Sequence, residues 1–348
     1  MSREGWGKIK LREACTKIGS GATPRGGKEV YLDNGPYSLI RSQNILDFHF
    51  SYNGLAYIDE GQARQLENVA IEEDDILLNI TGDSVARVCQ VPSELNKARV
   101  NQHVSIIRTD KARLNPQYLK YFLLNPKFKN FLLGLASVGG TRNALTKGMI
   151  EGFEIDAPKL STQITIASIL SALDEKIELN RQTNATLEAI AQAIFKEWFV
   201  DFNFPGATGE MVEGTLGMIP HGWLVGKLGD FGNIVCGKTP SKANMDFFGG
   251  EIPLIKIPDM HNSVFITKTE DSLTDEGASS QKNKFLPPFS VIVSCIATVG
   301  LVALTSKRSQ TNQQINAIVP KNDYLSFYLY LCAKGLPGSC IKFSINWA

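Results

Sequence analysis

The sequence predicts an α+β fold in which two similar α/β domains of short β-strands are joined by a long central α-helix with coiled-coil type packing. Two observations support this prediction. The chain repeats itself over a distance far longer than a solenoid repeat, so each copy is a domain. Between the copies, the stretch ASILSALDEKIELNRQTNATLEAIAQAIFKEWF at 167–199 contains neither proline nor glycine, whereas the flanking sequence is rich in both.

The repeat is visible in matched landmarks. GWGKIKL at 5–11 corresponds to GWLVGKL at 222–228, and the turns GATP and GKTP follow. Further along, LIRSQNI corresponds to LIKIPDM, and NQHVSIIR corresponds to NQQINAIV. One match could arise by chance, but a constant order with a smoothly changing offset indicates a duplicated domain. Runs rich in β-branched residues predict the strands, and one short helix per copy is expected near 118–124 and 324–331.

These patterns divide the chain into four parts. We expect a first domain at 1–160, the long helix at 161–202, a proline- and glycine-rich linker at 203–222 and a second domain at 223–348. The second copy has no counterpart to GGTRNALTKGMIEGFEIDAP of the first copy. We therefore expect the second domain to be truncated at its C-terminal end.

Composition excludes several classes of protein. The chain has 348 residues, of which 43% are hydrophobic and 20% charged, and a net charge of +1. It can bury a substantial core, but it is not uniformly basic, so nucleic-acid binding would have to use local surfaces. The six cysteines form no C-x-x-C pair and no metal-ligand spacing with the histidines, so we expect neither a metal nor a cofactor. No signal peptide or membrane span is apparent, which favours a cytoplasmic location without membrane contact.

The long helix carries a stripe of apolar residues along one side, at steps of three, four or seven. The stripe consists of Leu170, Leu173, Ile177, Asn180, Leu187, Ile190, Ile194 and Trp198. At about 1.5 Å per residue the helix would span on the order of 55 Å, which is longer than one domain. Asn180, the one polar residue of the stripe, would specify the register in which the stripe pairs with a partner helix. We interpret the helix as a spacer between the domains and as a docking surface for a partner helix.

Two similar domains at a fixed separation suit duplex DNA, which presents equivalent groove faces at intervals of about 34–36 Å. Predicted turns and strand ends carry side chains that pair with base edges or hold phosphates. In the first copy these are Thr23, Arg25, Lys28, Arg41, Ser42, Asn44, Thr81, Ser84, Arg87, Arg99, Gln102, His103, Thr141, Arg142 and Asn143. In the second copy they are Thr239, Lys242, Lys256, His261, Thr298, Gln313 and Gln314. Each alone more often marks solvated surface, so the clusters carry the argument.

The stretch PKLSTQITIASILSALDEKIELNRQTNATLEAIAQAIFKEWFVDF at 158–202 resembles the central conserved region of type I restriction-modification specificity subunits. The GATP and GKTP turns, LIRSQNI and SVGGTRNALTKGMIEGFEIDAP are similar to landmarks of the two target recognition domains of that family. The resemblance implies that each domain reads one half of a bipartite site in double-stranded DNA. It also implies docking of modification (methyltransferase) subunits on the helices and, through them, restriction (motor-nuclease) subunits. A homodimer through the central helix is a further expectation.

Enzymatic alternatives are weaker. The tetrapeptides NPQY at 115–118 and NPKF at 125–128 imitate the base-gripping N-P-P-[YF] motif of amino-methyltransferases but lack its second proline, and their prolines are expected to start helices. No Ser/His/Asp or Cys/His arrangement can be assembled. We expect a non-catalytic subunit. The competing interpretation is a protein-binding scaffold or an inactive truncated subunit that does not read DNA alone.

Overall fold

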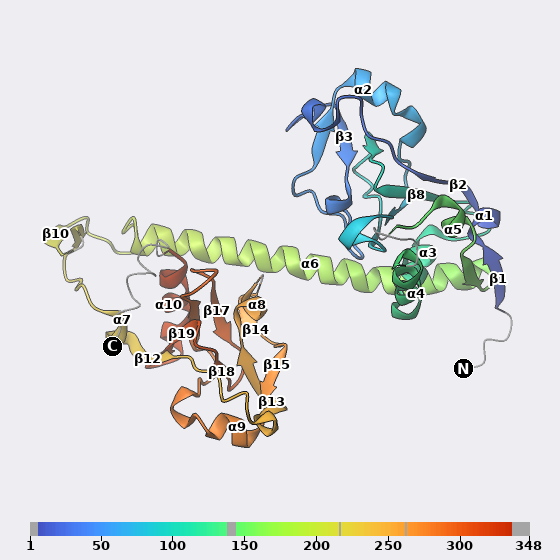
Figure 1. The fold of residues 1–348 in the computed structure, drawn as a ribbon. Coiled ribbons are helices and arrows are strands. Elements are labelled where there is room, and N and C mark those ends of the chain that lie inside the picture. Colours follow the sequence, from blue (N-terminus) through green and yellow to red (C-terminus); the bar gives the residue numbers. More distant parts are fainter. Residues whose placement is uncertain (1–5, 138–143, 216, 262, 336–348) are drawn as a thin grey trace. The chain divides into compact units, whose positions relative to one another are not determined.

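The computed structural model describes residues 6–137, 144–215, 217–261 and 263–335 (Figure 1). Its contacts divide the chain into a first unit, Met1–Thr183, and a second unit, Asn184–Ala348. The division falls inside α6 (Leu160–Phe199), one continuous helix of 40 residues. The expected long central helix is therefore confirmed, and at about 1.5 Å per residue it is about 60 Å long.

Unit 1 contains a four-stranded antiparallel sheet and a three-stranded mixed sheet. The first has the order β2 (Cys15–Ser20), β8 (Val104–Thr109), β5 (Ile76–Asn79), β6 (Val88–Gln90). The second has the order β4 (Ala56–Ile58), β3 (Tyr37–Ile40), β7 (Ala98–Val100). A separate pair joins β1 (Gly7–Lys10) to β9 (Glu154–Ala157). The helices are α1 (Leu11–Ala14), α2 (Glu60–Gln65), α3 (Pro116–Leu124), α4 (Pro126–Ser137) and α5 (Lys147–Glu151).

The four-stranded sheet of unit 1 is buried on both faces. Successive side chains of a strand point to opposite faces. Ile76 and Leu78 of β5 accordingly pack in the core that also contains α3, whereas Leu77 packs with the three-stranded sheet. On β8, Ile107 and Ile106 divide in the same way. Burial on both faces explains why these strands read as continuous apolar runs instead of alternating ones.

Unit 2 contains a five-stranded and a three-stranded sheet. The first has the order β12 (Gly232–Cys236), β19 (Ile315–Pro320), β16 (Val291–Ser294), β17 (Val302–Thr305), β14 (Phe265–Ile266). The second has the order β15 (Asp271–Leu273), β13 (Phe248–Ile255), β18 (Gln310–Thr311). The helices are α7 (Leu228–Phe231), α8 (Ile257–Met260), α9 (Asp275–Ser279) and α10 (Tyr324–Gly335).

The two units share one strand plan, which confirms that the domains are similar. The order β2-β8-β5-β6 recurs as β12-β19-β16-β17, and β4-β3-β7 recurs as β15-β13-β18. In both three-stranded sheets the central strand pairs antiparallel with one neighbour and parallel with the other. Even unusual backbone is repeated, because Asp74 and Phe289, two residues before β5 and β16, have φ of 69° and 64°. Such values are uncommon for residues other than glycine.

One part of the fold was not anticipated. The expected linker at 203–222 contains an antiparallel hairpin of β10 (Met211–Gly214) and β11 (Gly217–Pro220). Helices α3 and α4 each begin at the proline of an Asn-Pro pair, as expected. Asn115 caps α3 by accepting from Tyr118 N, so this Asn-Pro pair starts a helix as expected.

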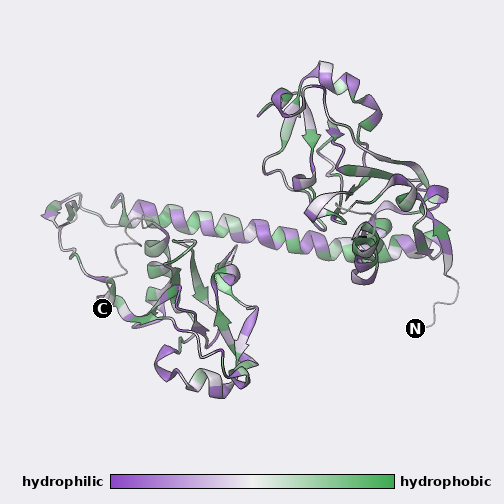
Figure 2. Cartoon of the chain, viewed as in Figure 1, coloured by the Kyte–Doolittle hydropathy of each residue, from purple (hydrophilic) through white to green (hydrophobic). Residues whose placement is uncertain are grey.

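Hydrophilic and hydrophobic residues alternate along α6 (Figure 2), and none of the described helices is long and apolar enough to cross a membrane.

Candidate nucleic-acid interface

Four of the expected DNA-contact residues of unit 1 form one hydrogen-bonded group, which we call the unit-1 cluster. It consists of Thr23, Thr81, Gln102 and His103. The Thr23 hydroxyl donates to Gln102 Oε1. Gln102 Nε2 lies 3.1 Å from His103 Nε2, and His103 Nδ1 lies 2.6 Å from Thr81 Oγ1. One ring nitrogen of His103 thus faces the Gln102 amide and the other faces the Thr81 hydroxyl. The cluster therefore links three separate loops.

Unit 2 has an equivalent group at the same places in its fold, the unit-2 cluster of Thr239, Gln313 and Gln314. The Thr239 hydroxyl donates to Gln313 Oε1 at 2.8 Å, as Thr23 does to Gln102. Gln314 N donates to Asn312 Oδ1 at 3.1 Å, and Asn312 Nδ2 donates to Gln314 Oε1 at 2.9 Å. Gln102 of unit 1 and Gln313 of unit 2 are both exposed. The amide of each thus stands at the surface with its orientation already restricted.

A buried asparagine supports each cluster. Asn101 and Asn312 are 6% and 7% exposed, so neither side chain can reach a ligand easily. Asn101 Oδ1 accepts from His103 N at 3.1 Å, which is the counterpart of the Asn312 bond to Gln314 N. These asparagines shape the loops that present the clusters. Asn312 was not among the expected site residues, although the Asn-Gln pair that the two copies share marks its position.

Other expected contact residues are engaged within unit 1. Arg99 is 6% exposed, bonds to the carbonyl oxygens of Ala63 and Ala98 and pairs with Glu67. Asn44 is fully buried and ties its own turn together. Arg41 is half-buried and donates to Gly54 O. These internal bonds hold the loops of unit 1 in shape.

The remaining expected residues are at least partly accessible but make no shared cluster. The exposed ones are Arg25, Lys28, Lys242, His261 and Thr298. The half-buried ones are Ser42, Ser84, Arg87 and Lys256. Lys256 forms an ion pair with Asp271. Thr141, Arg142 and Asn143 lie outside the described residues.

The apolar stripe of α6 is mostly exposed within each unit. Its side chains Leu173, Ile177, Leu187, Ile190, Ile194 and Trp198 are between 38% and 58% exposed. Asn180 is exposed and Leu170 is half-buried. Monomeric proteins rarely leave contiguous apolar surface uncovered, so the stripe has the character of an interaction surface.

Each unit is attached to α6 beside the stripe by a tyrosine and a lysine that share one carboxylate. In unit 1, Asp174 Oδ2 accepts from Tyr121 Oη at 2.6 Å and from Lys120 Nζ at 3.2 Å. In unit 2, Glu188 Oε1 accepts from Tyr330 Oη at 2.8 Å and from Lys334 Nζ. The bonds from Lys334 and Tyr330 hold the pKa of Glu188 below its ordinary value, because they favour the charged carboxylate.

The start of α6 is fixed by a glutamine. Gln163 is 1% exposed; its Oε1 accepts from Asn115 N at 2.9 Å and its Nε2 donates to Pro158 O at 2.9 Å. The glutamine of the P-K-L-S-T-Q stretch therefore binds the first turn of α3 to the first turn of α6. Within the described ranges, no group of three or more His, Cys, Asp or Glu side chains is arranged to hold a metal ion.

Comparisons with known proteins agree with this architecture. A family model described as the type I restriction modification DNA specificity domain matches residues 3–189 and 220–346. The type I restriction enzyme HindI specificity subunit of Haemophilus influenzae is 35% identical over 355 residues, covering 85% of this chain and 76% of that protein. The putative type I restriction enzyme MjaX specificity subunit of Methanocaldococcus jannaschii is 22% identical over 257 residues, covering 73% of this chain and 59% of that protein.

Among solved structures, the type I restriction-modification system S subunit from M. genitalium has the same fold. The match has a TM-score of 0.59 at 14% identity and covers 100% of this chain and 81% of that chain. The two ranges of the family model correspond to the two copies of the duplicated domain, and the first range also includes most of α6. The chain therefore belongs to the type I restriction-modification DNA specificity subunits.

Proposed function

We propose that each unit reads one half of a bipartite DNA site, and that α6 sets the separation of the halves and docks the modification subunits. The observation that carries this proposal is the occurrence of two equivalent clusters, each with an exposed glutamine held by a threonine hydroxyl. A glutamine amide can donate to and accept from an adenine edge together. Its restricted orientation lowers the entropy lost on binding.

The two clusters differ, which supports an asymmetric site. Position 103 is histidine where unit 2 has Gln314, and Thr81 bonds to that histidine. Unit 2 instead uses Gln314 to accept from Asn312. Different donors and acceptors favour different bases, so the half-sites should differ in sequence.

Flanking cations and hydroxyls complete the proposed interface. Arg25, Lys28 and Lys242 are exposed and suit phosphate contacts, which position the protein without reading sequence. Thr141, Arg142 and Asn143 remain proposed contacts of the first half-site. Arg41, Asn44 and Arg99 are proposed to support the loops and not to touch bases.

The exposed stripe of α6 is the proposed docking surface for modification subunits, and restriction subunits would join through these. In the absence of such partners, the stripe of one chain would pair antiparallel with that of a second chain. The subunit itself is proposed to be non-catalytic, with the methyl transfer and cleavage carried out by its partners.

Methylation profiling in the host tests the half-site proposal. A two-part modified motif should disappear when the gene is deleted, and Gln102→Ala and Gln313→Ala should each relax one half of it. Relaxation of both halves by either variant would contradict the assignment. DNA binding should also weaken steeply with salt, because released counterions set the slope. Salt-insensitive binding of protein partners without DNA binding would instead support the scaffold alternative.

A further inference from the structure

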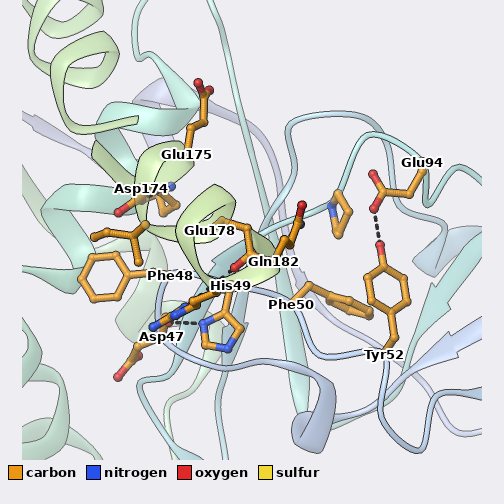
Figure 3. Close-up of a pocket in the computed structure, with 14 residues that line it drawn as sticks. Asp47, Phe48, His49, Phe50, Tyr52, Glu94, Asp174, Glu175, Glu178 and Gln182 are labelled. Atoms are coloured by element: carbon orange, nitrogen blue, oxygen red, sulfur yellow. Dashed lines mark hydrogen bonds and ion pairs between the residues drawn. The ribbon is translucent and has the colours of Figure 1, made fainter. Parts of the chain in front are cut away.

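Unit 1 contains a cavity of about 740 Å³ beside α6 that the DNA-reading proposal does not use. We call it the α6 cavity (Figure 3). One wall is the loop at 47–52, another is the loop with Pro92 and Glu94, and the third is the middle of α6. The α6 wall consists of Asp174, Glu175, Ile177, Glu178, Arg181 and Gln182. This volume is large enough for a long side chain together with part of its backbone.

The loop wall of the α6 cavity is aromatic. Phe48 is 49% exposed, and its φ of 71° is a backbone conformation that residues with side chains rarely adopt. Phe50 and Tyr52 meet edge to face with ring centroids 5.0 Å apart. The Tyr52 hydroxyl donates to Glu94 Oε1 at 2.5 Å, which links the two loops that line the cavity (Figure 3). Burial and the bond to Glu94 raise the pKa of Tyr52, so its hydroxyl remains a neutral donor.

The α6 wall is acidic. Carboxylates outnumber cations among the lining residues, and the cations present are already paired. Lys120 bonds to Asp174, and the Arg181 guanidinium lies 3.8 Å from Glu178. Glu175 forms no hydrogen bond or ion pair with any of the described residues that would neutralise it. A cavity with aromatic rings on one side and carboxylates on the other is suited to a cation.

We propose that the α6 cavity receives a lysine or arginine side chain from a basic segment of the modification subunit. This proposal rests on the proposed docking of that subunit on α6, and it adds the chemistry of the contact. Nucleic acid is disfavoured because the carboxylates repel phosphates. A second copy of the chain fits less well than a basic segment, because α6 carries five acidic and three basic residues and would bring net negative charge to this acidic wall.

The experiment measures the affinity of the purified chain for the purified modification subunit at 150 mM salt by biolayer interferometry. Glu175→Gln combined with Glu178→Gln, and separately Phe48→Ala, should each weaken binding at least about tenfold. The matched control is Glu73→Gln, an exposed carboxylate of unit 1 outside the cavity, which should change binding less than about twofold. A hexa-arginine peptide should compete with the modification subunit, and a hexa-glutamate peptide should not.

Three results would overturn the proposal. Unchanged affinity of the glutamine double variant would do so, as would an equal loss in the Glu73→Gln control. A change in self-association of the chain, with modification-subunit binding intact, would assign the cavity to a second copy. DNA binding by the same variants, measured at several salt concentrations, separates the cavity inference from the proposed reading of DNA. If DNA binding is retained and only docking is lost, the cavity inference stands. If the wild-type chain binds no modification subunit, both the cavity inference and the proposed docking on α6 fail.

Discussion

Replacing Gly21 by alanine should disrupt the unit-1 cluster and leave the unit-2 cluster intact. Gly21 leads from β2 into the loop that carries Thr23, and its N–H donates to Val104 O at 2.8 Å. A Cβ atom at this position would lie closer than 3.0 Å to the carbonyl oxygens of Val100 and Asn101. Backbone atoms cannot rotate away as side chains can, so the two segments must separate by about 1 Å.

This displacement sets the magnitude of the effect. Hydrogen bonds weaken steeply outside their distance range, so a separation of about 1 Å removes the bond between Thr23 and Gln102. Gln102 then loses its fixed orientation. A well-placed bidentate base contact is worth about 1–3 kcal/mol, so discrimination at the first half-site should fall about 5- to 150-fold.

The assay is methylation profiling in a host that carries the variant gene. A second measurement compares the affinity of the variant for the intact site with its affinity for DNA in which one half-site is scrambled. Gly19→Ala is the matched control, because Gly19 lies near the end of β2, two residues before Gly21, and a Cβ atom there would meet nothing within 4 Å. Gly237→Ala should relax the other half-site, since its Cβ atom would overlap Asn312 O in the same way. Undiminished discrimination in Gly21→Ala, or loss at both halves at once, would refute the reasoning.

Three further predictions follow from contacts elsewhere. Asp75 is fully buried and accepts from Arg108 Nε and Nη2, each at 2.8 Å. Asp75→Ala should therefore lower the free energy of unfolding of unit 1 by about 3 kcal/mol, measured by urea unfolding. A loss below about 0.5 kcal/mol would contradict this. Because the pKa of Glu188 is lower in the folded protein, its charged carboxylate stabilises the fold at pH values above 4.5, the ordinary pKa of a glutamate. This stabilisation is lost as the pH falls through the lower pKa of the folded state. Calorimetry of unit 2 should therefore show a smaller loss of stability on acidification for Glu188→Gln than for the wild type; parallel curves would argue against it. Leu187→Asp on the exposed stripe should weaken binding of modification subunits at least about tenfold in sedimentation velocity, and unchanged complexes would exclude the stripe.

The sequence predicted some polar positions better than others. The Thr-Pro turns and Asn-Gln pairs of the two copies led to Thr23, Gln102, Thr239 and Gln313, which do meet in the structure. Arg99 was grouped with them although it is buried against Ala63 O and Glu67. An arginine in a short strand looks the same in sequence whether it faces solvent or a neighbouring loop, because only the partner distinguishes the two.

The sequence by itself determined that the chain is two copies of one domain and a long helix. Those features follow from patterns read along the chain: matched landmarks, strand-length apolar runs, and a stretch without proline or glycine. Only the tertiary structure decided which polar side chains are free and which are internally bonded. It also assembled the α6 cavity from the loop at 47–52, Glu94 and the middle of α6. Burial and pairing depend on contacts between residues distant in sequence, and no local pattern records these contacts.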